Sequence, residues 1–385
     1  MKRIRSCLPY GRQLIDDDDV LSIVKVLKSQ FLTQGPRVFE FERALCAYTG
    51  AKYCVAVSSG TAALHLAVAA LGLKKGATGV TSPITFLASV NALVYNGIIP
   101  LFADIDAETV NVSLGALEGV IRKDTKVIIP VHFAGRPALM KEISAFAKRK
   151  NCFVIEDAAH AIGSRYLDGS RVGNGKYSDM TIFSFHPVKT ITTGEGGAVM
   201  TNNKKLYDFL CCLRSHGVTR SPLLIKNSPG PWYYEMRQLG FNYRLTDIQA
   251  ALGISQLRKI ESFIARRRHI VSLYNAAFKK HSCLRPVTTD DALCAYHLYV
   301  VRIDFAKLKL SRKEFIEKLT WEGVGTQVHY IPVYRQPFYE KNFHFSRKDF
   351  PEAEKYYKEC LSLPLFPAMT DNDVARVILA VLKLL

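Results

Sequence analysis

Short apolar segments alternate with helical segments across residues 51–201, and this alternation constrains the fold more than any other feature of the sequence. The apolar segments have the length and composition of buried strands, and helical patterns fit between most of them, for example at 61–70, 86–95 and 139–150. Alternation of this kind is typical of a mainly parallel sheet covered by helices on both faces. We therefore predict one large α/β domain with seven strands at residues 53–57, 79–81, 99–103, 126–131, 152–156, 181–185 and 198–201.

The last third of the chain has a different pattern. A long helical pattern covers residues 246–280 and is interrupted only by Gly253. It is followed by an α+β pattern, with a strand-like segment at 296–303, a helix-like segment at 312–321 and the apolar segment 326–333. A chain of 385 residues is too long for one ordinary core. We place a domain boundary inside the long helix near Glu261, which predicts an N-terminal arm and large domain at 1–260 and a smaller α+β domain at 261–385.

The composition is that of a soluble globular enzyme, because 48% of the residues are hydrophobic and 22% are charged. No apolar run approaches the roughly 20 residues that a membrane span needs. The 52 Lys and Arg residues exceed the 34 Asp and Glu residues, which gives a net charge of +18. A nucleic acid or a phosphorylated small molecule could be the reason for this excess. The dispersed charges and the lack of a nucleic-acid motif favour the small molecule.

The cysteines favour a reduced protein. Nine are present, an odd number, and none forms a CxxC pair. We expect free thiols in the reducing cytoplasm, with neither a disulfide framework nor a zinc site, and no other metal site is predicted.

One lysine stands in an unusual setting. Lys189 lies in "FSFHPVKTITTGEGGAV", between a proline and a run of glycines. Proline and glycine have the lowest helix propensities, and a central strand would avoid Pro187. Lys189 is therefore predicted at the tip of a turn between two strands. It is either a solvated surface lysine or a lysine presented to a ligand.

Two further segments come from the same predicted sheet. "FVIEDAAHA" is a strand that ends in Glu156-Asp157, and ligands bind at the carboxyl ends of parallel strands. Asp157 either caps the next helix or faces a ligand, and His160 could turn toward the same pocket. In "VSSGTAALHLAV", a tight Ser-Ser-Gly-Thr turn precedes a helix, and the free amides at this helix N-terminus make either an anion site or an ordinary cap. An amine nucleophile, a strand-end aspartate and a phosphate cradle together are what pyridoxal phosphate requires.

The sequence resembles the DegT/DnrJ/EryC1/StrS family of sugar aminotransferases, which have the aspartate-aminotransferase type I fold. The matching stretches cover the chain nearly end to end: "LTQGPRVFEFE", "SSGTAALHLA", "SPITFLAS", "EDAAHAIGS", "FSFHPVKTITTGEGGAV", "RSHG", "GFNYRLTDIQAALGISQL" and "HYIPVY". The pairing of "LTQG" with "QVHYIPVY" is most similar to the branch of the family in the pseudaminic acid pathway, which acts on a UDP-4-keto-6-deoxy-N-acetylhexosamine.

The resemblance implies a role for each matching residue. Lys189 is the Schiff-base lysine and proton carrier, and Asp157 pairs with the pyridine nitrogen. His160 lies beside the phenolic oxygen of the cofactor. The other implied cofactor contacts are Phe86 stacked on the ring, Gly60, Thr61 and Ser184 at the phosphate, and Asn242 reaching the phosphate from the neighbouring subunit. The implied contacts to the nucleotide sugar are Tyr10, Gln30, Phe31, Leu32, Thr33, His329, Tyr330, Ile331 and Pro332.

The resemblance implies a homodimeric aminotransferase with shared active sites, in which glutamate donates the amine and C4 of the ketosugar accepts it. Within the family, a dTDP-linked 3- or 4-ketohexose remains an alternative substrate. A dehydratase of the same fold would carry histidine in place of Lys189. A non-catalytic regulator would have lost Lys189 or Asp157, and this chain retains both.

Overall fold

A seven-stranded sheet forms the centre of the large domain in the computed structural model, which describes residues 7–220, 225, 227–287 and 291–385. The strand order is β1-β7-β6-β5-β4-β2-β3, and β7 alone runs antiparallel to its neighbours. The predicted mainly parallel sheet is therefore confirmed. Its strands are β1 (Tyr53–Val57), β2 (Thr78–Thr81), β3 (Ile99–Phe102), β4 (Thr125–Ile129), β5 (Phe153–Asp157), β6 (Met180–Ser184) and β7 (Gly197–Thr201).

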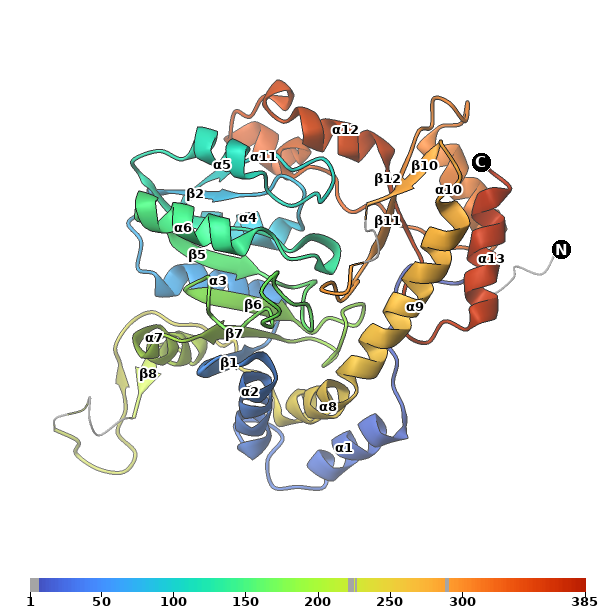
Figure 1. The fold of residues 1–385 in the computed structure, drawn as a ribbon. Helices are drawn as coiled ribbons and strands as arrows, with labels where there is room; N and C mark the ends of the chain where they lie inside the picture. Colours follow the sequence, from blue (N-terminus) through green and yellow to red (C-terminus); the bar gives the residue numbers. More distant parts are fainter. Residues whose placement is uncertain (1–6, 221–224, 226, 288–290) are drawn as a thin grey trace.

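Helices cover both faces of this sheet (Figure 1). Because strand residues alternate between faces, Val154 of β5 joins the core under α2, α6 and α8, whereas Ile155 joins the core under α3, α4 and α7. The helices up to α8 are α1 (Asp17–Leu27), α2 (Pro36–Thr49), α3 (Gly60–Ala70), α4 (Leu87–Tyr95), α5 (Leu114–Val120), α6 (Met140–Lys150), α7 (Lys204–Arg214) and α8 (Asp247–Arg258). The strands β8 (Val218–Thr219) and β9 (Glu235–Met236) follow α7 and pair in an antiparallel manner.

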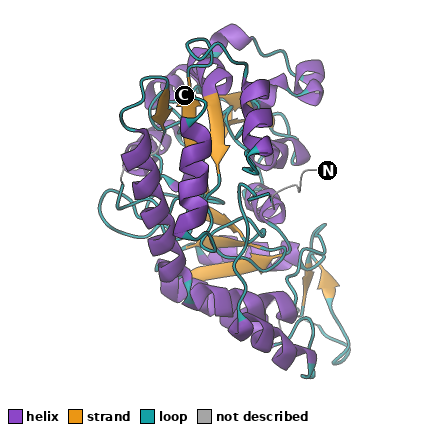
Figure 2. Ribbon diagram, turned by 90° about the vertical axis from the view of Figure 1, so that its right-hand side faces the viewer, coloured by secondary structure: helices purple, strands orange, loops and turns teal. Residues whose placement is uncertain are grey.

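The C-terminal part has its own apolar core around a three-stranded antiparallel sheet, which lies apart from the large sheet in Figure 2. Leu8 from the N-terminal arm also packs into this core and bridges to Val324. The elements are α9 (Ile260–Phe278), β10 (Leu284–Pro286), β11 (Tyr299–Ile303), α10 (Arg312–Trp321), α11 (Pro337–Asn342), α12 (Pro351–Glu359), β12 (Cys360–Leu363) and α13 (Asp371–Leu382). No described helix combines the length and the apolar character that crossing a membrane demands.

One local prediction needs correction. The helical pattern at 246–280 is broken at Lys259, where α8 ends and α9 begins in a new direction (Figure 1), and not at Gly253. Gly253 lies inside α8 because the ring of Phe41 packs against it, and an added Cβ would lie 2.6 Å from that ring. The segment 326–333 is a loop with a single bridge, from Gln327 to Ser362, and adds no strand to the small sheet. All nine cysteines are free thiols, as predicted.

Candidate active site

Lys189 lies in a turn between β6 and β7, as predicted, and lines a cavity of about 570 Å³. The amide of Lys189 donates to the carbonyl of His186 at 2.9 Å, which closes the turn. Burial lowers the pKa of the Lys189 ammonium to about 8, although the nearby Asp157 carboxylate opposes this shift. An appreciable share of the amine is therefore neutral near neutral pH, as a nucleophile requires.

Asp157 is the last residue of β5 and is buried at the wall of the same cavity. The hydroxyl of Ser89 donates to its Oδ2 at 2.6 Å, and the amide of Ala159 donates to its Oδ1 at 3.1 Å. No α-helix follows, because residues 159–163 form turns. Asp157 thus presents a fixed carboxylate to the cavity rather than capping a helix.

The N-terminus of α3 opens into the cavity beside β6. Ser59 is the N-cap, and its hydroxyl accepts from the amide of Ala62 at 3.0 Å. Gly60 and Thr61 lie in the first turn of α3, where no carbonyl within the helix can accept from their amides. Both amides therefore remain available to an anion. An added Cβ on Gly60 would lie 2.8 Å from the Cβ of Ser184, so only glycine lets that hydroxyl approach.

Two neutral histidines form one wall. The Nε2 of His160 lies 3.1 Å from the hydroxyl of Tyr330, and the ring of His297 packs against the His160 ring at 4.3 Å. Burial lowers the pKa of both imidazoles well below the ordinary value, and the charge of Lys189 adds to this. Both rings are therefore uncharged at neutral pH. The Nδ1 atom of each ring is buried without a hydrogen-bond partner among the described residues.

Another part of the lining comes from residues 327–331, from Gln336 and from Tyr10 of the N-terminal arm. The Nδ1 of His329 lies 2.8 Å from the hydroxyl of Ser362, and burial lowers the pKa of His329 to about 3. The ring of Tyr10 packs on His329 at 5.3 Å. Phe86, at the start of α4, is 58% exposed and lines the cavity, where an apolar face is available for a flat ring.

Comparison with known proteins agrees with this geometry. The model of the DegT/DnrJ/EryC1/StrS aminotransferase family matches residues 13–382. The chain belongs to this family. It is a nucleotide-sugar aminotransferase that depends on pyridoxal phosphate, and it has the type I aminotransferase fold.

Named family members share most of their length with the chain. The spore coat polysaccharide biosynthesis protein SpsC of Bacillus subtilis is 41% identical over 97% of this chain and 96% of its own. The UDP-4-amino-4,6-dideoxy-N-acetyl-beta-L-altrosamine transaminase of Campylobacter jejuni is 40% identical over 96% of this chain and 95% of its own.

Two solved structures of aminotransferases have the same fold. Helicobacter pylori PseC, an aminotransferase of pseudaminic acid biosynthesis, superposes with a TM-score of 0.92 at 31% identity and covers 98% of this chain and 99% of its own. The pyridoxal phosphate form of the putative sugar aminotransferase Spr1654 from Streptococcus pneumoniae gives 0.88 at 30% identity, over 98% of this chain and all 100% of its own.

The residues present fit the family cofactor. The cavity holds Lys189, whose pKa is lowered, and the buried carboxylate of Asp157. At the N-terminus of α3, the backbone amides form a cradle for an anion, and a Cβ on Gly60 would fill this space. The predicted cofactor residues that line it are Lys189, Asp157, His160, Gly60, Thr61, Phe86 and Ser184.

The remaining predicted residues lie partly in the cavity lining and partly outside it. Among the described residues that line the cavity are Tyr10, His329, Tyr330 and Ile331, whereas Gln30, Phe31, Leu32, Thr33, Pro332 and Asn242 are not part of that lining. The carbonyl of Leu32 accepts from the amide of Asp247 at 3.0 Å, so its segment packs beside α8. Asn242 is exposed and bridges to Ser215. Pro332 directly follows the cavity-lining Ile331.

Sequence reasoning missed two site residues. Ser89 lies within the family stretch "SPITFLAS", and its spacing three residues after Phe86 on a helix would have placed it beneath the same pocket. His297 is the second residue of the strand-like "YHLYVVRI" and resembles an ordinary core histidine there. Only the three-dimensional contact with His160 reveals it.

Proposed function

We propose that this aminotransferase moves an amino group from glutamate to C4 of a UDP-linked 4-keto-6-deoxy-N-acetylhexosamine, and thereby forms UDP-4-amino-4,6-dideoxy-N-acetyl-β-L-altrosamine for pseudaminic acid biosynthesis. The observation that carries this proposal is that His329, Tyr330 and Ile331, from the "QVHYIPVY" stretch, line the same cavity as Lys189. Relatives named for this sugar, at 40% identity, and for this pathway, at a TM-score of 0.92, support it. The positive net charge suits an anionic diphosphate.

The residues of the chain would act in separate ways. Pyridoxal phosphate, when bound, supplies the electron sink for amine transfer. We assign Lys189 to covalent attachment of the cofactor and to proton transfer, and Asp157 to holding the proton on the pyridine nitrogen. Ser184 and the α3 amides would hold the phosphate, and Phe86 would stack on the ring.

The test of the substrate is a panel of ketosugar nucleotides offered with glutamate, with the product configuration read by NMR. We expect turnover of the UDP-linked N-acetylated 4-ketosugar. Robust activity on dTDP-4-keto-6-deoxyglucose without activity on the UDP sugar would assign the enzyme to a different branch of the family. Glutamate is tested in the same assay against other amino donors.

The enzyme is further proposed to be a homodimer in which Asn242 serves the partner's site. Support comes from its exposure outside the cavity of its own chain. Lys189→Ala and Asn242→Ala chains, each nearly inactive, would be unfolded, mixed and refolded. Half of the dimers are then mixed, each with one intact site of two, so about a quarter of wild-type activity should return. Activity equal to the sum of the two parents would show that Asn242 acts within its own chain.

The nine free thiols support the proposal that the enzyme works in the reducing cytoplasm. Fractionation of the native host would test it, and recovery of the enzyme outside the cytoplasm would contradict it.

A further inference from the structure

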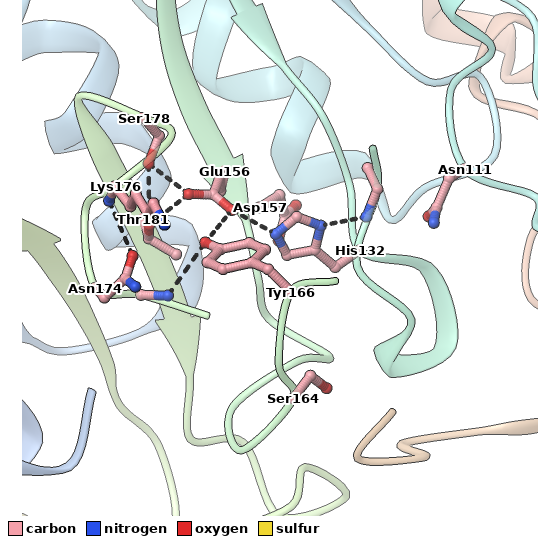
Figure 3. A network of polar contacts seen from close by, with 12 residues as sticks. Asn111, His132, Glu156, Asp157, Ser164, Tyr166, Asn174, Lys176, Ser178 and Thr181 are labelled. Atoms are coloured by element: carbon pink, nitrogen blue, oxygen red, sulfur yellow. Dashed lines mark hydrogen bonds and ion pairs between the residues drawn. The ribbon is translucent and has the colours of Figure 1, made fainter. Parts of the chain in front are cut away.

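Glu156 is a fully buried carboxylate on β5, next to Asp157 but on the other face of the sheet. Four side chains converge on it (Figure 3). Its Oε2 accepts from Nε2 of His132 at 2.7 Å and from the hydroxyl of Tyr166 at 2.6 Å. Its Oε1 accepts from the hydroxyl of Thr181 at 3.0 Å and from the hydroxyl of Ser178.

The direction of the histidine bond follows from its second nitrogen. The amide of Ala138 donates to Nδ1 of His132 at 3.1 Å, so in the neutral imidazole the proton is on Nε2 and points at Glu156. Burial raises the pKa of the Glu156 carboxyl, but the donors from His132, Ser178 and Tyr166 outweigh it, and the net pKa lies below the ordinary value. Glu156 is therefore an ionised acceptor with its donors in place.

The loop after β4 and strand β6 also lie beside the backbone of Asp157. The amide of His132 donates to the carbonyl of Asp157 at 3.0 Å, and the amide of Asp157 donates to the carbonyl of Pro130 at 2.9 Å. Thr181 lies on β6 beside the end of β5, and its register partner there is Glu156. Glu156 thus ties the loop after β4 and strand β6 to β5 one residue before Asp157.

We propose that Glu156 is a positioning residue for Asp157. Glu156 holds the end of β5 so that the Asp157 carboxylate would meet the pyridine nitrogen of the cofactor. This inference rests on the cofactor role assigned to Asp157 under the proposed function. The contacts from Ser89 and Ala159 hold only the Asp157 side chain on the cavity face. Its backbone amide and carbonyl both bond to the loop after β4, which Glu156 joins through His132.

The test compares Glu156→Ala with Glu156→Gln. Glutamine can still accept from His132 and Tyr166, and its amide can donate to the hydroxyls of Ser178 and Thr181, so it keeps the bonds and removes the charge. The readouts are the affinity of the apoenzyme for pyridoxal phosphate, the visible band of the bound cofactor with its pH titration, and the thermal midpoint of the apoenzyme.

We expect Glu156→Ala to lose roughly tenfold in cofactor affinity and to shift the band titration, because a small misplacement of a binding group costs about this much or more. Glu156→Gln should restore both properties to within about twofold of wild type, about the smallest change such titrations separate. A glutamine variant as impaired as the alanine variant would overturn the positioning role in favour of a charge effect.

The control is Glu42→Gln, at another buried carboxylate that accepts from the amide of Ala56 at 2.9 Å and from Arg214. It should lower the thermal midpoint and leave cofactor affinity and the band unchanged. A Glu156→Ala enzyme that behaves in the same way would reduce Glu156 to a purely structural role.

If the alanine variant does not fold, the Tyr166→Phe variant tests the positioning role instead, because it removes one hydrogen-bond donor to Glu156. A shifted band titration in that variant supports the proposal, and an unchanged one overturns it. None of these readouts involves the sugar. A wild-type enzyme that binds the cofactor but rejects the UDP sugar would therefore contradict only the proposed substrate.

Discussion

The two sides of the active-site cavity are built in different ways. The cofactor side comes from the ends of regular elements of the large sheet, with Asp157 ending β5, Ser184 ending β6 and Gly60 opening α3. The other side comes from the irregular segment 327–331, from Gln336 after the short 3-10 helix at Val333–Arg335, and from Tyr10 of the N-terminal arm. Rigid elements hold chemistry shared by a family, whereas loops can change specificity without disturbing the scaffold. Substitutions on the two sides should therefore have separable effects.

The largest effect is expected from Lys189→Ala on the cofactor side. We expect amine transfer to fall by roughly 10³-fold or more, because we assign to this lysine both the attachment of the cofactor and the proton transfer. Borohydride treatment of the wild-type enzyme should fix the cofactor on Lys189, as read by peptide mapping. A label on another lysine would show that the turn between β6 and β7 is not the attachment site.

Asp157→Ala should have the next largest effect. The variant should retain some cofactor but lose most amine transfer, by roughly 10²-fold or more, because the pyridine nitrogen is no longer kept protonated. Asp157→Glu keeps the charge and displaces it by one methylene, so its loss should be smaller. Turnover close to wild type in the alanine variant would mean that the cavity does not hold the pyridine nitrogen at the end of β5.

The pH dependence of cofactor uptake tests the environment of Lys189 on the cofactor side. Only the neutral amine attacks, and the pKa of Lys189 is lowered to about 8. The rate at which the apoenzyme takes up pyridoxal phosphate should thus rise with pH to about 8 and then level off. Asp157 raises this pKa, so Asp157→Asn should move the midpoint to lower pH. A rate that still climbs near pH 10, as for an ordinary lysine, would contradict the buried environment.

The cofactor side was also the more predictable side from sequence. Its strands have strong apolar periodicity, and its turns carry glycine and proline, whose backbone preferences are local. β1 was predicted at its observed bounds, and Lys189 was predicted in its turn. Local signals of this kind suffice to place a residue at a strand end.

The other side depends on contacts that local sequence does not encode. The segment 326–333 is apolar enough to suggest strand, yet it forms a loop against Tyr10 and Ser362 from distant parts of the chain. The helix break at Lys259 has no proline or glycine beside it from which it could be predicted. His297 is recognised only through its packing on His160. The loop and His297 are thus set by tertiary contacts between distant parts of the chain.

The smallest effect is expected from Tyr10→Ala on the loop side. The Tyr10 ring packs on His329, while the backbone carbonyl of Tyr10 accepts from the amide of Leu365 at 3.0 Å and stays in both variants tested. We expect KM for the sugar nucleotide to rise roughly 3- to 10-fold, the value of one aromatic contact, with cofactor affinity unchanged. Tyr10→Phe keeps the ring and serves as the matched control, so its KM should stay closer to wild type. If Tyr10→Ala weakened cofactor binding as much as sugar binding, the two sides of the cavity would not be separable, because the arm would then support the cofactor as well.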